Sequence, residues 1–298
     1  MSGVAHDDPV IRSLLALAAL AVAGFVLVTR WSVVLAGHPA YLVLLVALAV
    51  TGAVLGLRAR RERPGGTARR VGRVTGALLL VLVLAATVWL RPYAATEPVA
   101  TADSTGVDVV ETATTWELVP RAAPAATGLV FLPGALVDPR AYLPLLRPAA
   151  EAGHVVVLVK PPLDLALLSP PPLGPRPGVT RWLVGGHSLG GAAATFAADD
   201  PRVAGLVLWA AYPNSDLSGS DLPVLSVSGD RDGLATPADI DAARPLLPPD
   251  TRYVVVPGGN HAFFGDYGAQ AGDGEAAVPR EEAQRTIVRA TVDFLDEQ

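Results

Sequence analysis

Three long apolar runs occupy the first 90 residues of the chain, at 13–29, 40–57 and 74–90, and none of them contains a charged residue. A helix needs about 20 apolar residues, and at least roughly 17, to cross the hydrocarbon core of a bilayer. The pattern therefore predicts three transmembrane helices in a membrane region at 1–91. A cleaved signal peptide is the alternative for the first run, which lacks a strongly basic flank and a small-residue cleavage site.

The segment between the second and third runs is rich in arginine. It carries seven arginines against the single Glu62: Arg58, Arg60, Arg61, Arg63, Arg69, Arg70 and Arg73. Short loops rich in Lys and Arg remain on the cytoplasmic side of a membrane. The third helix then runs outward, so we expect a multi-pass protein of the cell membrane with everything after residue 91 on the extracytoplasmic side. Arg12, just before the first run, agrees with a cytoplasmic N-terminus.

The pattern changes after residue 105, where short apolar runs alternate with helical ones. The predicted strands are 107–111, 115–119, 128–132, 155–159, 181–185, 203–210, 224–228 and 253–256, and the predicted helices are 139–152, 192–198, 237–246 and 281–295. Strands that are apolar on both faces and alternate with helices are typical of a mostly parallel sheet covered on both sides. We therefore expect an α/β domain at 105–298, joined to the membrane region by a Pro-, Thr- and Ala-rich linker at 92–104.

Charge is divided at the same boundary. Residues 1–91 hold ten arginines and three acidic residues, whereas residues 92–298 hold 13 basic and 25 acidic residues. An acidic domain is poorly suited to binding nucleic acid, so we expect no nucleic-acid partner. The chain has no cysteine, which excludes disulfides, a cysteine nucleophile and thiolate metal ligands. We expect neither a cofactor nor a metal.

One serine lies between pairs of glycines in the stretch "LVGGHSLGGAAATF" at 183–196. Gly186-His187-Ser188-Leu189-Gly190 matches G-x-S-x-G, with an apolar strand before it and a helix-forming run after it. In a sharp strand-to-helix turn the backbones approach so closely that side chains two positions on either side of the serine would clash. Gly186 and Gly190 would provide that room. The turn would expose the Ser188 hydroxyl near the N-terminal N–H groups of the next helix.

A serine hydroxyl becomes nucleophilic only when a base removes its proton and a carboxylate holds that base in the right tautomer. Candidates for both follow later in the chain. Asp230 and Asp232 come after the strand 224–228, and His261 comes after the strand 253–256. His187, inside the serine turn, is expected to pack and hydrogen-bond behind the nucleophile. The choice between Asp230 and Asp232 stays open on this reasoning.

The three stretches "GGHSLGG", "SGDRDGLATP" and "GGNHAFFGDYG" resemble the nucleophile, acid and histidine loops of the α/β-hydrolase superfamily, in the dienelactone-hydrolase-like group of small hydrolases. The resemblance covers roughly residues 105–297 and leaves out the membrane region. It implies Ser188 as nucleophile, His261 as base and then acid, and Asp232 as orienting carboxylate, with Asp230 as the alternative. Dienelactone hydrolases use a cysteine nucleophile, and its absence here argues against their substrate.

The resemblance also implies two backbone N–H donors for the oxyanion that forms during acyl transfer. One belongs to Leu189, directly after the nucleophile. The other belongs to the loop after "FLPG", where Ala135 is the expected donor and Leu136 the alternative. Pro133-Gly134 would otherwise be a plain turn.

The site is expected to be open, because only "YPNSDLSGSDLP" separates two strands where many members of the superfamily insert a helical lid. The loops 169–178 and 263–278 would form its rim, with Phe263, Phe264 and Tyr267 expected to pack beneath the second loop. The sequence thus predicts a membrane-anchored serine hydrolase of carboxylic esters or thioesters. Its expected partners are a small-molecule ester or lipid-like acyl substrate, and membrane lipids around the helices. A membrane-tethered pseudoenzyme or scaffold, and an acyltransferase with the same triad, remain as alternatives.

Overall fold

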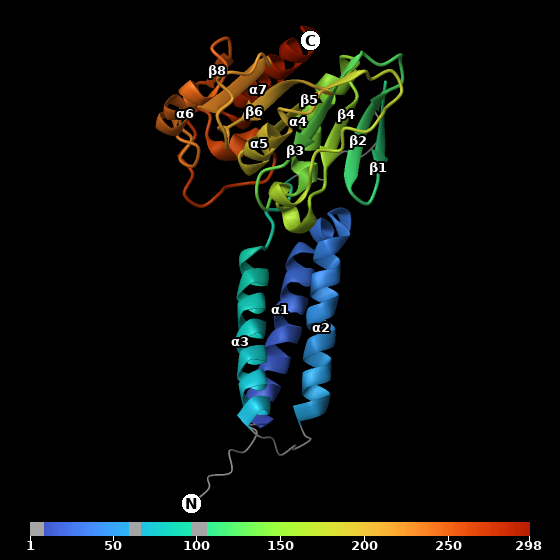
Figure 1. Cartoon of the computed structure of the whole chain (residues 1–298), viewed down its shortest axis with the longest axis vertical. Coiled ribbons are helices and arrows are strands. Elements are labelled where there is room, and N and C mark those ends of the chain that lie inside the picture. Colours follow the sequence, from blue (N-terminus) through green and yellow to red (C-terminus); the bar gives the residue numbers. More distant parts are fainter. Residues whose placement is uncertain (1–8, 60–66, 97–105) are drawn as a thin grey trace, which may run out of the picture. The chain divides into compact units, whose positions relative to one another are not determined.

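The computed structural model describes residues 9–59, 67–96 and 106–298 (Figure 1). Internal contacts divide the chain into two compact units, Met1–Pro92 and Tyr93–Gln298. The described part of the first unit is helical, and the second is built on one sheet.

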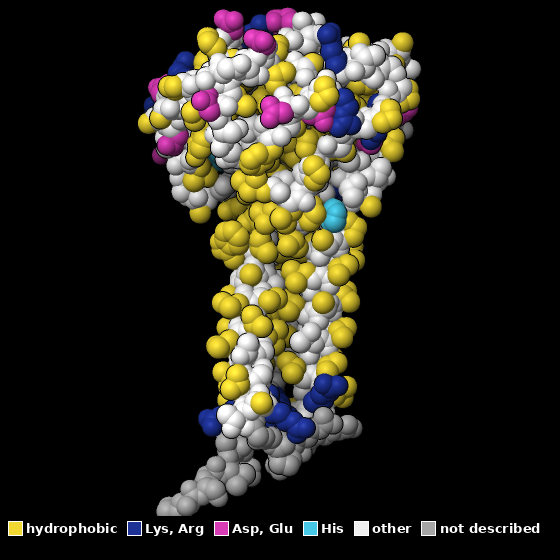
Figure 2. Space-filling view, in the orientation of Figure 1, with side chains coloured by type: hydrophobic (Ala, Val, Ile, Leu, Met, Phe, Trp, Pro, Cys, Tyr) yellow, Lys and Arg dark blue, Asp and Glu magenta, His cyan; other side chains and the backbone are white. Residues whose placement is uncertain are grey.

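The membrane unit consists of α1 (Pro9–Ala36), α2 (Pro39–Ala59) and α3 (Thr67–Trp89). By length and composition all three could cross a membrane, as the three apolar runs predicted. Apolar side chains make up much of the surface of these helices in the view of Figure 2, and Leu14, Val43 and Leu78 are each at least 60% exposed. This is the surface that lipid tails would cover. Each helix begins or ends beyond its apolar run and includes at least one arginine there, such as Arg12 in α1, Arg58 in α2 and Arg73 in α3.

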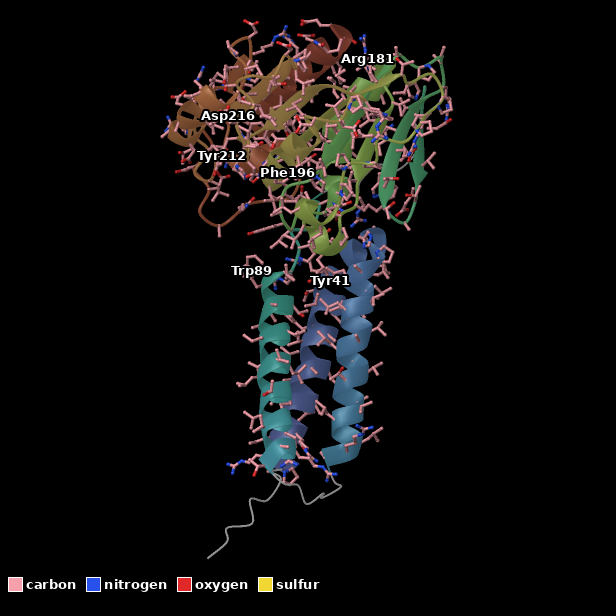
Figure 3. The ribbon with its side chains drawn as sticks, in the orientation of Figure 1. Tyr41, Trp89, Arg181, Phe196, Tyr212 and Asp216 are labelled. Carbon is pink, nitrogen blue, oxygen red and sulfur yellow. The ribbon has the colours of Figure 1, made fainter. Side chains whose placement is uncertain are left out.

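Close packing and hydrogen bonds hold the three helices together. A Cβ atom at Gly52 of α2 would lie 2.9 Å from the carbonyl oxygen of Ala16, so glycine lets α2 approach α1 closely. The hydroxyl of Tyr41, labelled in Figure 3, donates to the carbonyl oxygen of Leu90 at 3.1 Å and so joins α2 to the chain just after α3. Arg12, Arg69 and Arg73 line one surface hollow where α1 and α3 begin.

The second unit has an eight-stranded sheet in the order β1-β2-β4-β3-β5-β6-β7-β8. The strands are β1 (Val107–Glu111), β2 (Thr115–Pro120), β3 (Thr127–Leu132), β4 (Val156–Val159), β5 (Arg181–His187), β6 (Val203–Trp209), β7 (Val224–Gly229) and β8 (Arg252–Val256). β2 pairs antiparallel with β1 and β4, and all the other pairs are parallel. This confirms the predicted mostly parallel sheet, to which β1 and β2 add an antiparallel hairpin at one edge.

Helices cover both faces of the sheet: α4 (Leu143–Glu151), α5 (Leu189–Ala194), α6 (Pro237–Ala243) and α7 (Arg280–Asp296). Successive residues of a strand point to opposite faces. Leu208 of β6 shares an apolar core with Ala193 of α5, whereas the next residue, Trp209, donates a hydrogen bond from its indole to Thr291 of α7 at 3.0 Å. Helices α5 and α7 therefore lie on opposite faces, which is the expected α/β architecture.

Element boundaries differ from the prediction where proline interrupts a helix. The predicted helix 139–152 begins with a 3-10 turn at Pro139–Tyr142 before α4, and the predicted helix 237–246 changes to a 3-10 turn at Arg244–Leu246. Proline lacks the N–H that a regular α-helical turn requires. The loop between β6 and β7, marked by Tyr212 and Asp216 in Figure 3, contains no helix, as expected for a site without a lid.

The expected linker at 92–104 lies largely outside the described residues. Its first residues are bound to the sheet unit: the N–H of Tyr93 donates to the carbonyl oxygen of Leu136 at 2.6 Å, and the N–H of Thr96 donates to that of Asp266 at 2.8 Å. The sheet unit therefore starts at Tyr93, within the segment that composition suggested as a linker.

Candidate active site

The predicted site residues lie in loops that follow β3, β5, β7 and β8. These four strands are parallel, so their carboxyl ends lie along the same edge of the sheet. Loops at that edge are the usual place for a ligand site in an open α/β sheet. The sheet order therefore brings together segments that are far apart in the sequence.

Ser188 occupies the turn between β5 and α5 in a strained conformation, with φ 52° and ψ −123°. A non-glycine residue at positive φ is uncommon and costs conformational energy, which the surrounding structure must offset. The Ser188 N–H donates to the carbonyl oxygen of Trp209 at 2.9 Å. A Cβ atom at Gly186 would lie 2.6 Å from the carbonyl oxygen of Leu132, and one at Gly190 would lie 2.6 Å from the carbonyl carbon of the same residue. These distances confirm the steric reason given for both glycines.

Asp232 and His261 form a buried pair. The imidazole Nδ1 of His261 lies 2.8 Å from Oδ2 of Asp232, and the two side chains are only 1% and 0% exposed. The other carboxylate oxygen of Asp232 accepts the N–H groups of Leu234 and Ala235, both at 2.8 Å. Asp232 is thus fixed by its own loop, and Oδ2 is left to pair with His261. In a neutral imidazole with its proton on Nδ1, facing Oδ2, Nε2 would be an acceptor.

Asp230 occupies a different position. Its side chain is exposed, and its Oδ1 accepts the N–H of Gly258 at 2.7 Å. Asp230 therefore joins the loop after β7 to the loop after β8, and it is Asp232 that the structure brings to His261.

His187 packs behind the serine turn, as expected. Its ring lies parallel to that of Phe264 at 5.7 Å, and its centroid is 4.5 Å from that of His261. Because His187 directly precedes Ser188, this contact places the His261 ring beside the turn. Nε2 of His261 is buried and has no hydrogen-bond partner within the described residues, so it is not bonded to the serine hydroxyl in this structure. Catalytic hydrogen bonds often tighten only when substrate binds.

Tyr142 links the serine turn to the loop after β3. Its hydroxyl accepts the N–H of Gly134 at 2.9 Å and lies 2.9 Å from Nδ1 of His187. Burial raises the pKa of Tyr142 above its ordinary value of 10, and burial together with the His261 ring lowers the pKa of His187 well below 6.5. A neutral tyrosine can then donate its O–H to a neutral imidazole, which satisfies Nδ1 of His187.

The loop after β3 and the start of α5 offer two backbone donors. Across the described part of the chain, the N–H groups of Ala135 and Leu189 have no hydrogen-bond partner. The N–H of Leu136 donates to the carbonyl oxygen of Asp164 at 2.8 Å and is therefore engaged. The geometry thus favours Ala135 over Leu136 as the second donor.

Asp164, in the loop after β4, is a buried acid that the sequence did not single out. It is 4% exposed, and its carboxyl group forms no hydrogen bond with the residues that the structure describes. Asp164 and Leu163 both have φ 56°, so two successive residues are strained. Burial raises the pKa of Asp164 to about 8, and the Asp138 carboxylate adds to the rise. The pattern "PPLDLALL" indicates a turn but carries no sign of this environment.

The aromatic residues of the loop after β8 lie largely beneath it, as expected. Phe264 and Tyr267 are 0% and 3% exposed, and Phe263 is half-buried under the guanidinium of Arg280, 4.8 Å from its ring centre. After the serine turn and α5, the chain reaches Phe196, which is 65% exposed (Figure 3).

Among the described residues no group of His, Asp or Glu has the arrangement of a metal site.

Comparison with known proteins agrees with this geometry. Residues 128–285 match the sequence profile of the alpha/beta hydrolase family, which is more than half of the chain. The chain belongs to the α/β hydrolase family. The match spans β3 to the first turns of α7 and includes the serine, aspartate and histidine loops. No curated protein matches the chain.

Several solved structures are similar to this α/β hydrolase at low sequence identity. A dienelactone hydrolase from Anabaena variabilis is 18% identical, with a TM-score of 0.46 over 64% of this chain and 98% of that one. A butyrate-bound esterase from Thermogutta terrifontis is 14% identical, with a TM-score of 0.46 over 64% and 94%. Est1E from Butyrivibrio proteoclasticus is 12% identical, with a TM-score of 0.44 over 64% and 99%.

Proposed function

We propose that this chain is a membrane-anchored serine hydrolase that cleaves carboxylic ester or thioester bonds. The observation that carries the proposal is the buried Asp232–His261 pair, 2.8 Å between Oδ2 and Nδ1, beside the strained turn that holds Ser188. A nucleophile, a base and an orienting carboxylate in this chain order are the parts of a serine hydrolase triad.

In the proposed acylation step, Nε2 of His261 accepts the hydroxyl proton of Ser188 while Oγ bonds to the substrate carbonyl carbon. The carbonyl oxygen becomes an oxyanion, which the free N–H groups of Ala135 and Leu189 would bind. The tetrahedral intermediate then expels the alcohol or thiol, which takes its proton from His261. Asp232 stays ionised and stabilises the imidazolium throughout.

Deacylation repeats these steps with water as the nucleophile. His261 accepts a proton from water, whose oxygen bonds to the acyl carbon, and the proton returns to Oγ of Ser188 as the carboxylic acid leaves. The half-exposed Ser188 and the absence of helix between β6 and β7 support access for water. An acyl acceptor other than water would make the same chain an acyltransferase.

The membrane anchor supports a substrate at the cell envelope. The three helices are long and apolar enough to span a bilayer, and Arg12, Arg69 and Arg73 lie together where α1 and α3 begin. By the positive-inside rule that end is cytoplasmic, and the hydrolase unit would face the extracytoplasmic side. A small ester or a lipid-like acyl compound fits that place.

The test uses the full chain in detergent, a fluorophosphonate probe and short p-nitrophenyl esters. We expect the probe to label Ser188 alone, and we expect Ser188→Ala to abolish both labelling and ester hydrolysis. The exposed Ser215 provides a matched control, because Ser215→Ala removes a hydroxyl from the loop between β6 and β7. Hydrolysis by Ser188→Ala at the wild-type rate would refute the mechanism. A folded wild-type protein that neither reacts with the probe nor hydrolyses the esters would favour a binding scaffold.

A further inference from the structure

The segment Gly272–Gly274 lies farther along the loop after β8 and packs against the stretches that carry Asp232 and His261. A Cβ atom at Gly233, next to Asp232, would lie 2.6 Å from the backbone nitrogen of Gly274. On the other side, the side-chain amide of Asn260, next to His261, donates to the carbonyl oxygen of Gly274 at 2.8 Å. The segment therefore contacts both loops within one residue of the acid and of the base.

Asp273, at the centre of this segment, accepts four backbone N–H groups. Its Oδ1 accepts those of Gly233 at 3.2 Å, His261 at 3.0 Å and Gly274 at 2.7 Å, and its Oδ2 accepts that of Ala262 at 2.9 Å. An ionised carboxylate can only accept hydrogen bonds, and bonds to a charged acceptor are about twice as strong as neutral ones. One carboxylate thus joins the loop after β7 to the loop after β8.

The other links between these loops lie closer to the sheet. Asp230 accepts the N–H of Gly258, and the N–H of Arg231 donates to the carbonyl oxygen of Gly259 at 3.0 Å. Farther from the sheet, the described residues form two direct hydrogen-bond links between the loops. One is the bond between Asp232 and His261 themselves, and the other is made by the carboxylate of Asp273, which binds the N–H of Gly233 in one loop and those of His261 and Ala262 in the other. The carboxylate of Asp273 therefore joins the two loops at the positions of Asp232 and His261.

We propose that Asp273 is a positioning residue that sets the spacing between Asp232 and His261 by holding both of their loops. The proposal rests on the proposed function of the Ser188, His261 and Asp232 side chains. Asp273 touches no reacting atom, because its oxygens are occupied by backbone N–H groups. Its effect on catalysis comes through geometry, and a misplacement of about 1 Å can cost on the order of 10²-fold in rate.

Two substitutions separate this role from general stability. Asp273→Ala removes all four bonds, so we expect kcat to fall about 10²-fold while KM stays within about two-fold, because the substrate is still bound by the same groups. Asp273→Asn keeps one acceptor oxygen but turns an NH2 group toward an N–H donor. We therefore expect a smaller loss, about ten-fold, which is partial rescue by the conservative variant.

Asp200→Ala is the matched control. Asp200 accepts the backbone N–H of Arg202 at 2.9 Å and pairs with its guanidinium, and it lies before β6, away from the carboxyl edge of the sheet. Asp200→Ala, like Asp273→Ala, removes a charged acceptor from a turn, but this turn does not hold the Asp232 or His261 loop. We therefore expect kcat to remain at the wild-type value. Equal losses of kcat in the Asp200 and Asp273 variants, in step with their melting temperatures, would overturn the proposal.

Proton NMR of the full chain in detergent gives a readout that does not need activity. The imidazole N–H of His261 bound to Asp232 should give a far-downfield resonance in the wild type and in Asp200→Ala, and this resonance should be lost or shifted in Asp273→Ala. If wild type neither hydrolyses esters nor labels at Ser188, the proposed function fails, and the resonance still judges the role of Asp273. An unchanged resonance together with kcat within about three-fold of wild type would overturn it. Should Asp273→Ala fail to fold, Asp273→Asn carries the same test.

Discussion

Replacing the buried acid Asp164 by asparagine should stabilise the protein at high pH and leave it nearly unchanged at low pH. The pKa of Asp164 is raised from 3.8 to about 8, chiefly by burial and then by the neighbouring Asp138 carboxylate. Because folding raises the pKa of this acid, its protonated form contributes to the stability of the folded state. The contribution is fully present below the pKa of the unfolded chain. That contribution is lost as pH rises from about 4 through about 8, because the unfolded chain releases the proton first.

The two pKa values differ by about four pH units, and each unit corresponds to about 1.4 kcal/mol, so ionisation at this site costs the folded state roughly 6 kcal/mol at most. Asparagine has nearly the same shape and never ionises, so Asp164→Asn avoids this loss. For a folding unit the size of Tyr93–Gln298, each kcal/mol moves the melting temperature by about 2–4 °C. We therefore expect the variant to melt about 10 °C or more above wild type at pH 8.

The assay is thermal unfolding of full-length wild type and variant in detergent, at intervals from pH 4 to pH 8, followed by near-UV circular dichroism. Taking the difference between the two proteins cancels the titration of every other group that the substitution does not touch. Asp216→Asn is the control, because its exposed carboxylate has a pKa lowered by hydrogen bonds from Ser218. The reasoning would be refuted if the difference in melting temperature between Asp164→Asn and wild type did not change with pH. It would also be refuted if wild type melted at the higher temperature at pH 8.

Two further predictions concern the serine turn and the side of the membrane. Tyr142→Phe leaves the N–H of Gly134 and Nδ1 of His187 buried without partners, so unfolding in denaturant should show a loss of about 3 kcal/mol in the free energy of unfolding. Ester hydrolysis should also slow, because the loop with the proposed oxyanion donor Ala135 loosens. Unchanged stability would show that the hydroxyl is not needed there. Because the chain has no cysteine, single cysteines report topology. A membrane-impermeant maleimide should label Ser215→Cys in intact cells and Thr67→Cys only after permeabilisation, and the reverse result would invert the assigned orientation.

The sequence predicted the strands and the serine turn because both depend on local patterns. Runs such as 128–132 and 203–210 are apolar at every position, which is typical of strands in a parallel sheet that is covered on both faces. Gly186 and Gly190 are needed for a turn whose clashes arise within a few residues and the adjacent strand end. Patterns of this kind can be interpreted before the chain is folded.

The residues that escaped prediction act through contacts between distant segments. Tyr142 reaches His187 across 45 residues, and the bond from Asp273 to Gly233 spans 40. Before folding, nothing distinguishes the tyrosine of "PRAY" or the aspartate of "AGDGE" from ordinary residues of a helix start and a turn. Asp164 escaped for a related reason, since its raised pKa depends on burial and on Asp138.

Asp230 and Asp232 show where local pattern ends and tertiary geometry begins. Both follow β7 within three residues, so either could be the acid on sequence order alone. In the structure the two carboxylates have different partners. Asp230 accepts a backbone N–H of the loop after β8. Asp232 accepts two N–H groups of its own turn with one oxygen and pairs with His261 through the other. A carboxylate that must orient a base has to be buried and held by its own loop, because an exposed one would be solvated and mobile. Burial and anchoring, rather than order along the chain, therefore favour Asp232 as the proposed triad acid.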